Sequence, residues 1–181
     1  MQREHNRQEK AQISAASDRV LQSIELVVET LEQEKQRLDR LIDDHIDRHP
    51  RLKQDRDLLE SIPGVGRVLS RHLMAAFRSR AFRSARQMAA YLGVVPVEHT
   101  SGSSVYRRPR LSKAGSATLR AKLYLPAIVA LKYNAQAKAL YERLVAQGKA
   151  KKSAIGAVMR KLVHICFGVL KHQQTYVPPV A

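Results

Sequence analysis

The sequence predicts an all-α protein, in which a long coiled-coil helix precedes a compact helical domain with a helix-hairpin-helix and a long Ser/Arg-rich loop. Three observations predict this fold. Apolar residues recur at heptad spacing within residues 1–50, helical apolar patterns recur beyond residue 51, and glycines, prolines and serines gather between residues 93 and 115. We therefore expect a coiled-coil arm over residues 1–50, a helical domain over 51–175 and a tail over 176–181.

The arm is predicted to be one helix over residues 8–48, because neither proline nor glycine interrupts the chain before Pro50. At ~1.5 Å per residue, such a helix spans roughly 60 Å. Its apolar residues follow a heptad seam with one gap at Glu34: Val20, Ile24, Val27, Leu31, Leu38 and Leu41. A partner helix has to cover this seam. It comes either from a second copy or from the same chain folding back, and we favour a homo-oligomer.

Two further helices, over residues 51–61 and 66–78, are joined by the tight turn Pro63-Gly64-Val65-Gly66, which is the layout of a helix-hairpin-helix. Gly64 and Gly66 permit a turn that leaves backbone N–H groups free at the start of the second helix, where Arg67 follows. The helix dipole favours an anion at that end, so these three residues are candidate contacts for a nucleic-acid phosphate. The alternative is an ordinary turn between two helices, capped by glycine.

Four more helices are predicted in the rest of the domain. Ser84 caps a short helix over residues 84–92, which Gly93 ends. From 94 to 115 the chain is expected to be irregular, and so long a loop is uncommon in a compact domain unless it has a function. Helices follow over 116–133, kinked near Pro126, over 135–147 and over 151–171, before a loose tail.

Positive charge is concentrated in the helical domain. The chain has 32 Lys and Arg against 16 Asp and Glu, a net charge of +16. Residues 1–60 carry 11 basic and 14 acidic side chains, whereas residues 61–181 carry 21 basic side chains and only Glu98 and Glu142 as acids. A folded segment with this excess attracts a polyanion, because binding releases condensed counterions. Nucleic acid is the leading partner, an anionic membrane surface is second, and ribosomal RNA is third.

The sequence also argues against several classes of protein. The chain has one cysteine, Cys166, in an apolar segment, so no disulfide forms within it, as suits a reducing cytoplasm. The first twelve residues are polar, unlike a signal peptide, and no apolar run is expected to reach transmembrane length. We therefore expect a cytoplasmic protein with no membrane partner, and no metal site or cofactor within this chain.

The loop over residues 94–115 combines hydroxyl groups with cations. Serines and a threonine precede Arg107, Arg108 and Arg110. A serine that attacks phosphorus needs fixed cations to offset charge on the equatorial oxygens, so this combination suits phosphoryl transfer. The alternative is a flexible Gly/Ser-rich loop whose three arginines contact DNA phosphates without catalysis.

Five short motifs, in order, resemble the C-terminal domain of DEDD-type insertion-sequence transposases, the insertion sequence one-ten family, whose relatives include the Piv-type DNA invertases. The motifs are Ser61-Ile62-Pro63-Gly64-Val65-Gly66, Ala89-Ala90-Tyr91-Leu92-Gly93-Val94-Val95-Pro96, Ser101-Gly102, Leu111-Ser112-Lys113-Ala114-Gly115 and Leu119-Arg120. The resemblance covers roughly residues 55–172, and the upstream helix resembles the coiled-coil linker of that family.

The resemblance implies a function in DNA transposition and recombination. In that family a serine of the C-terminal domain becomes joined to a DNA strand, and Ser101, which precedes a glycine, is the matching nucleophile, with Ser103 and Ser104 as rivals. Lys113 and Arg120 are then phosphate contacts. An N-terminal RuvC-like domain supplies four acidic residues that hold Mg²⁺, and some members are guided by an RNA encoded by the element and assemble as multimers.

This sequence departs from the family pattern because the RuvC-like domain is absent. Two acids beyond residue 60 cannot build a four-carboxylate metal site, so Mg²⁺ is expected only with a separate RuvC-like domain. We interpret the chain as a transposase C-terminal part, from a truncated copy or a separately encoded half. The alternatives are a non-catalytic helix-hairpin-helix protein, such as an architectural factor or transposition regulator, and a basic ribosome-associated protein.

Overall fold

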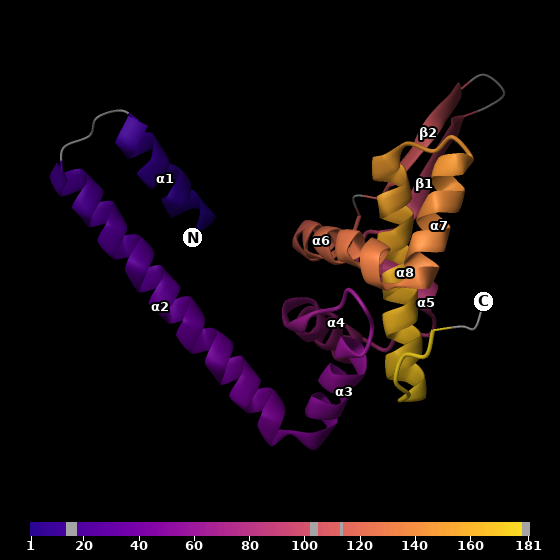
Figure 1. Ribbon diagram of the computed structural model, residues 1–181, viewed down its shortest axis with the longest axis horizontal. Helices are drawn as coiled ribbons and strands as arrows, with labels where there is room; N and C mark the ends of the chain where they lie inside the picture. Colours follow the sequence, from indigo (N-terminus) through magenta and orange to yellow (C-terminus); the bar gives the residue numbers. More distant parts are fainter. Residues whose placement is uncertain (14–17, 102–104, 113, 179–181) are drawn as a thin grey trace. The chain divides into compact units, whose positions relative to one another are not determined.

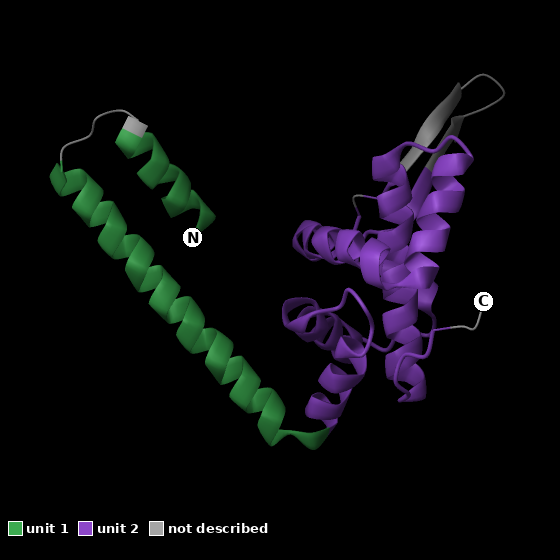
Figure 2. Ribbon diagram, viewed as in Figure 1, with its two compact units in different colours: residues 1–50 green, residues 51–181 purple. Residues whose placement is uncertain are grey.

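The structure, a computed structural model, describes residues 1–13, 18–101, 105–112 and 114–178 (Figure 1). Within those ranges the chain is helical apart from one two-stranded hairpin, so the predicted all-α class is confirmed. The chain divides into two compact units, residues 1–50 and 51–181 (Figure 2).

The first unit contains two helices, α1 (Gln2–Ile13) and α2 (Asp18–Arg48), where the sequence had predicted one. That prediction was wrong. Ser14 and Ser17 stand between the two helices in the sequence, and serine favours helix ends over helix interiors. Helix α1 contacts α2, and Ala11 of α1 and Ile24 of α2 are buried.

Most of the heptad seam of α2 remains open to solvent in a single chain. Of its six apolar residues only Ile24 is buried, and the others are exposed: Val20, Val27, Leu31, Leu38 and Leu41. Folding back of α1 therefore covers the seam only in part. Pairing of α2 with a second copy stays a prediction.

The second unit is built around α8 (Lys151–His172). It contacts α5 (Ala85–Tyr91), α6 (Ala117–Tyr133) and α7 (Ala135–Ala146), and α4 (Arg67–Ser79) also contacts α6 (Figure 1). The core-facing side chains of α8 include Ala154, Val158, Met159, Leu162, Val163, Cys166 and Leu170. Removing this apolar surface from water is the main stabilising contribution to the unit.

Three helix starts in this unit follow the capping rules. Ser84 accepts a hydrogen bond from the Gln87 amide, as predicted, Ser116 accepts one from the Leu119 amide, and Asn134 accepts one from the Ala137 amide. Each cap satisfies a backbone donor that the first helical turn leaves without a partner.

Helix α8 is also long and apolar enough to cross a membrane, by length and composition alone. The expectation that no apolar run reaches that length was therefore wrong. Most of its apolar side chains are buried against the other helices of the unit, which accounts for its composition as that of a core helix.

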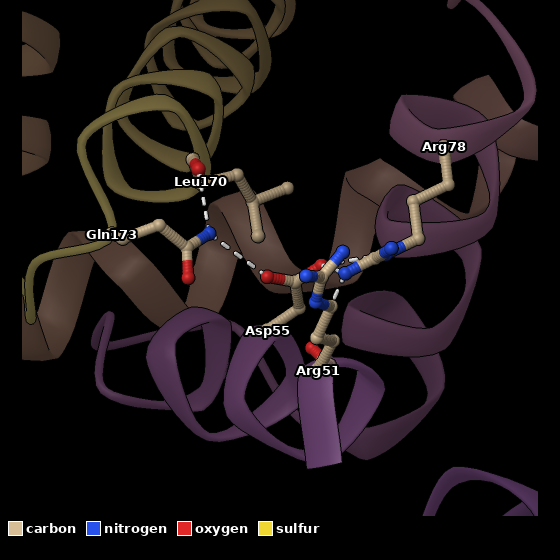
Figure 3. Close-up of polar contacts among 5 residues, drawn as sticks. All are labelled: Arg51, Asp55, Arg78, Leu170 and Gln173. Carbon is tan, nitrogen blue, oxygen red and sulfur yellow. Dashed lines mark hydrogen bonds and ion pairs between the residues drawn. The ribbon is translucent and has the colours of Figure 1, made fainter. Parts of the chain in front are cut away.

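A buried carboxylate connects two helices and the segment after α8 (Figure 3). Asp55 of α3 (Pro50–Glu60) is 3% exposed, and its Oδ2 atom lies 2.7 Å from Nη2 of Arg78. The side-chain amide of Gln173 donates to its Oδ1 atom at 2.9 Å, and Arg78 also donates to the Arg51 carbonyl. Because the carboxylate has partners on both oxygens, its burial is compensated.

The start of the predicted tail is held against the same unit. The Tyr176 amide donates to the Ser61 hydroxyl at 3.0 Å, and the Tyr176 hydroxyl lies 3.3 Å from Oδ1 of Asn134. Tyr176 therefore packs with the helical domain.

Residues 96–101 and 105–111, predicted to lie in an irregular loop, pair as the two antiparallel strands of a β-hairpin. Its strands are β1 (Pro96–Ser101) and β2 (Val105–Leu111), so the prediction was wrong. The prolines that argued for a loop, Pro96 and Pro109, are tolerated because each strand of a two-stranded sheet has one free edge. The register shifts between Val97 and His99, where the strand pairing is irregular.

Candidate nucleic-acid interface

The turn between α3 and α4 has the pattern of a type II β-turn. The Val65 amide donates to the Ile62 carbonyl at 2.9 Å, Pro63 holds the second position, and Gly64 holds the third with φ of +98°. An added Cβ at Gly64 would lie 2.8 Å from Cβ of Ala130 and 3.0 Å from the Pro126 carbonyl of α6. Gly64 is therefore required both by the turn and by close packing against α6.

The first turn of α4 presents its backbone without a side-chain cap. Gly66 is the N-cap residue in an extended conformation, no side chain accepts from the following amides, and no atom lies within 4 Å of the space that a Cβ on Gly66 would fill. Arg67 and Val68 follow and are exposed. Unsatisfied amides at a helix start, next to an arginine, suit a phosphate.

Packing between α3 and α4 fixes the direction of this helix start. Ser70 is fully buried, and its hydroxyl donates to Oε1 of Glu60 at 2.8 Å. The turn residues Ile62 and Val65 are buried beside Leu69. Two helices joined by a tight turn are therefore present, as the sequence predicted. That this pair is a helix-hairpin-helix and contacts DNA stays a prediction.

The hairpin register arranges the predicted catalytic segment. Ser101 is the last residue of β1 and pairs with Val105, while His99 pairs with Arg107. Because alternate residues of a strand share a face, Ser101, His99 and Arg107 occupy positions on one face, and Arg108 occupies a position on the other. Arg110 pairs with Val97 beyond the irregularity in β1.

Two glycines and one arginine close the base of the hairpin. A Cβ on Gly115 would overlap the backbone of Gly93, so the two segments approach more closely than side chains permit. Nη1 of Arg120 lies 3.4 Å from the carbonyls of both Ser112 and Gly115, and the Ser112 amide donates to the Val95 carbonyl at 2.8 Å. Arg120, predicted to contact phosphate, thus binds the main chain at the base of the hairpin.

Some predicted contacts lie outside what the structure describes. Lys113 is outside the described residues, and so are the side chains of Ser101, Arg107, Arg108 and Arg110. Their roles rest on backbone register and stay predictions.

Comparison with known proteins agrees with the motifs. Residues 56–142 match the family model described as transposase IS116/IS110/IS902 family. The chain is 34% identical over 130 residues to the pilin gene-inverting protein of Moraxella bovis, covering 70% of this chain and 40% of that protein. It is 29% identical over 144 residues to an insertion element IS900 protein of Mycobacterium paratuberculosis, covering 77% of this chain and 34% of that protein.

Residues 56–142 belong to the IS116/IS110/IS902 transposase family. This transposase segment runs from α3 through the turn and the hairpin to α7, so it includes every residue predicted to act on DNA. The chain spans about 40% or less of the length of these relatives.

The residues around the transposase segment do not fit a Mg²⁺ site. Within the described ranges, no group of three or more His, Cys, Asp or Glu side chains is placed to hold a metal ion. Asp55 is committed to Arg78 and Gln173, and Glu142 lies 3.8 Å from Lys138. The described residues therefore offer no carboxylate cluster of the kind that Mg²⁺ prefers.

The transposase segment and α8 also bring together cations that sequence analysis did not single out. Helices α5 and α8 are in contact, and the charges of Arg86 on α5 and of Arg160 and Lys161 on α8 all act on His164 of α8. Burial of His164, followed by the charges of the other three side chains, lowers the pKa of its imidazole. The spacing of Arg160, Lys161 and His164 on α8 can be seen in the sequence, but only the fold brings α5, and with it Arg86, to this helix.

Proposed function

We propose that this chain is the DNA-binding and strand-transferring part of a bacterial recombinase that acts in the cytoplasm, with Ser101 as the nucleophile. Membership of a transposase family supports a recombinase, and one relative carries the name of a pilin gene-inverting protein. The observation that carries the proposal is the hairpin register, because Ser101, His99 and Arg107 share one face at the end of β1.

The proposed reaction exchanges one phosphoester for another. The hydroxyl oxygen of Ser101 attacks a DNA phosphorus and His99 accepts the hydroxyl proton. A serine–phosphorus bond forms as the bond from phosphorus to a deoxyribose oxygen breaks, and that oxygen leaves as a hydroxyl with the proton that His99 held. Arg107 offsets the negative charge on the equatorial oxygens.

The remaining predicted contacts position the DNA. The start of α4, with Gly66 and Arg67, binds one backbone phosphate, and Arg108, Arg110 and Lys113 bind others near the hairpin. Mg²⁺ belongs to a RuvC-like domain supplied by another segment or chain, because the described residues do not fit the ion. A guide RNA and a second copy of the chain are further proposed partners.

Capture of a covalent protein–DNA adduct tests the nucleophile. The chain is combined with the RuvC-like segment of a relative and labelled duplex DNA, and the adduct is resolved under denaturing conditions. We expect Ser101→Ala to abolish the adduct while the DNA dissociation constant stays within about twofold, because one hydroxyl contributes little to binding beside the many phosphate contacts.

Ser103→Ala and Ser104→Ala are the matched controls, and we expect both to retain the adduct. An adduct that survives Ser101→Ala and disappears in either control would transfer the role to that serine. If no serine substitution matters and DNA binding alone is found, the chain is a non-catalytic binding protein. Recovery with ribosomes and not with DNA would overturn the proposal.

A further inference from the structure

We infer that the cation cluster on α5 and α8, made of Arg86, Arg160, Lys161 and His164, is a second binding site for the phosphodiester backbone of nucleic acid. This inference rests on the proposed function only in taking nucleic acid as the partner. None of these four residues belongs to the predicted helix-hairpin-helix or to the β-hairpin.

The cluster carries positive charge without a carboxylate to balance it. Where side chains are described, no Asp or Glu forms an ion pair with Arg86, Arg160 or Lys161. The groups that act on His164 are Arg160 and Lys161 on its own helix and Arg86 on the neighbouring α5, and all are cations. Like charges held together in a fold attract an anion.

Two nitrogen atoms of the cluster are buried without a partner. Nε of Arg160 and Nε2 of His164 are shielded from solvent and have no hydrogen-bond partner among the described residues. Buried polar atoms in native proteins nearly always have partners, so both side chains have hydrogen-bonding capacity that the described residues leave unused. A phosphate oxygen is an acceptor that a guanidinium and an imidazolium bind strongly.

The part of the cluster that lies on α8 is close to the β-hairpin. Gly156, Arg160 and His164 follow one another at four-residue intervals, so they share one face of the helix. A Cβ at Gly156 would lie 3.3 Å from Leu111, the last residue of β2, so the hairpin base rests at the start of this face. Arg160 follows about 6 Å further along the helix axis. A nucleic-acid strand held at the cluster therefore passes close to the hairpin.

Salt-dependent DNA binding by the full chain tests the site. The double variant Arg86→Gln/Lys161→Gln removes two charges from the cluster without touching its buried atoms. The control Lys132→Gln/Lys138→Gln removes two charges from exposed positions on α6 and α7.

Each lost phosphate contact reduces the slope of log K against log salt by about 0.9. We expect the cluster variant to lose about 2 from the slope and about tenfold or more in affinity at ~0.1 M salt, and the control to lose much less.

A second readout follows the imidazole itself. In NMR titrations with duplex DNA and with folded RNA, we expect the pKa of His164 to rise on binding, because a phosphate favours the imidazolium. The signal is assigned by its loss in His164→Gln. Inorganic phosphate is the third ligand in this titration. If the His164 pKa rises with inorganic phosphate but with neither DNA nor RNA, the inference is overturned.

The outcomes separate the two proposals. Equal slopes for the cluster and control variants, with an unmoved His164 pKa, overturn the second site while Ser101 chemistry stands. If the unmodified chain binds no nucleic acid at all, both the second site and the proposed function are overturned.

Discussion

At the scale of single residues, the two glycines of the α3–α4 turn have different roles. Gly64 has a positive φ and lies against Ala130 and the Pro126 carbonyl, whereas Gly66 has an ordinary extended conformation with open space around it. From the sequence, both glycines are predicted to be phosphate contacts. The sequence could not show that one of them faces α6, because Pro126 and Ala130 come from a distant segment.

We therefore expect Gly64→Ala to lower the free energy of unfolding by roughly 2 kcal/mol or more, because it combines backbone strain with overpacking. Gly66→Ala is the matched control, and it should change stability by no more than about 0.5 kcal/mol. Urea unfolding followed by circular dichroism measures both. Equal stabilities of the two variants would contradict the packing assigned to Gly64.

Cys166 gives a second prediction at this scale. The side chain is fully buried, and burial raises the pKa of its thiol to about 12. We expect the native protein to react with a disulfide reagent at pH 8 only as fast as it unfolds, so added urea should accelerate the reaction. Fast labelling without urea would contradict the burial.

The same shift has a consequence for stability. An unfolded thiol ionises near its ordinary pKa of 9.0, while the folded thiol stays neutral up to about 12. Between these values the folded state binds more protons, so the contribution of Cys166 to stability falls as pH rises, by up to about 1.4 kcal/mol per pH unit. Cys166→Ala should lack this part of the pH dependence.

At the scale of elements, Asp55 is the point where α3, α4 and the end of α8 meet (Figure 3). We expect Asp55→Asn to lower the free energy of unfolding by about 2 kcal/mol, because it leaves Arg78 without its carboxylate. This value is below that for a fully buried pair, since the Arg78 side chain is 40% exposed.

Glu142→Gln is the control for Asp55→Asn, because Glu142 pairs with Lys138 four residues earlier on the surface of α7. Exposed pairs contribute little, so we expect a change within about 0.5 kcal/mol. Thermal unfolding of both variants provides the comparison. A larger effect at Glu142 than at Asp55 would contradict the structural role of the buried carboxylate.

The helices of the second unit were predictable because their signals are local. Serine caps and apolar spacing lie within one helix, as Ser84 and the segment it opens illustrate. The β-hairpin was missed because its two prolines, its glycine and its serines are typical of a loop, although its strand pairing is local. The Arg86 cluster was missed because Arg86 and α8 come from distant segments of the chain.

At the scale of the whole molecule, the open seam of α2 predicts self-association. We expect the 20.4 kDa chain to run as an oligomer at micromolar concentrations, with two copies burying Leu31 and Leu38 against each other. Leu31→Lys/Leu38→Lys should shift the mass measured by light scattering to that of one chain.

Leu26→Lys controls for added charge on the same helix. Leu26 is exposed but lies outside the heptad seam, so this variant should keep the mass of the unmodified protein. A single-chain mass for the unmodified protein, or an oligomer that survives the double substitution, would contradict the pairing.

The hydrogen bonds from Gln173 to Asp55 and from Tyr176 to Ser61 join residues more than a hundred positions apart. During synthesis, α3 and the turn after it leave the ribosome long before these partners exist. Parts of the chain made earlier can fold first, yet the α3–α4 pair acquires these two hydrogen bonds only after residues 173 and 176 have been made. A nascent chain that stops before Gln173 would lack both bonds, so quality-control proteases have a physical means of recognising such a shortened product.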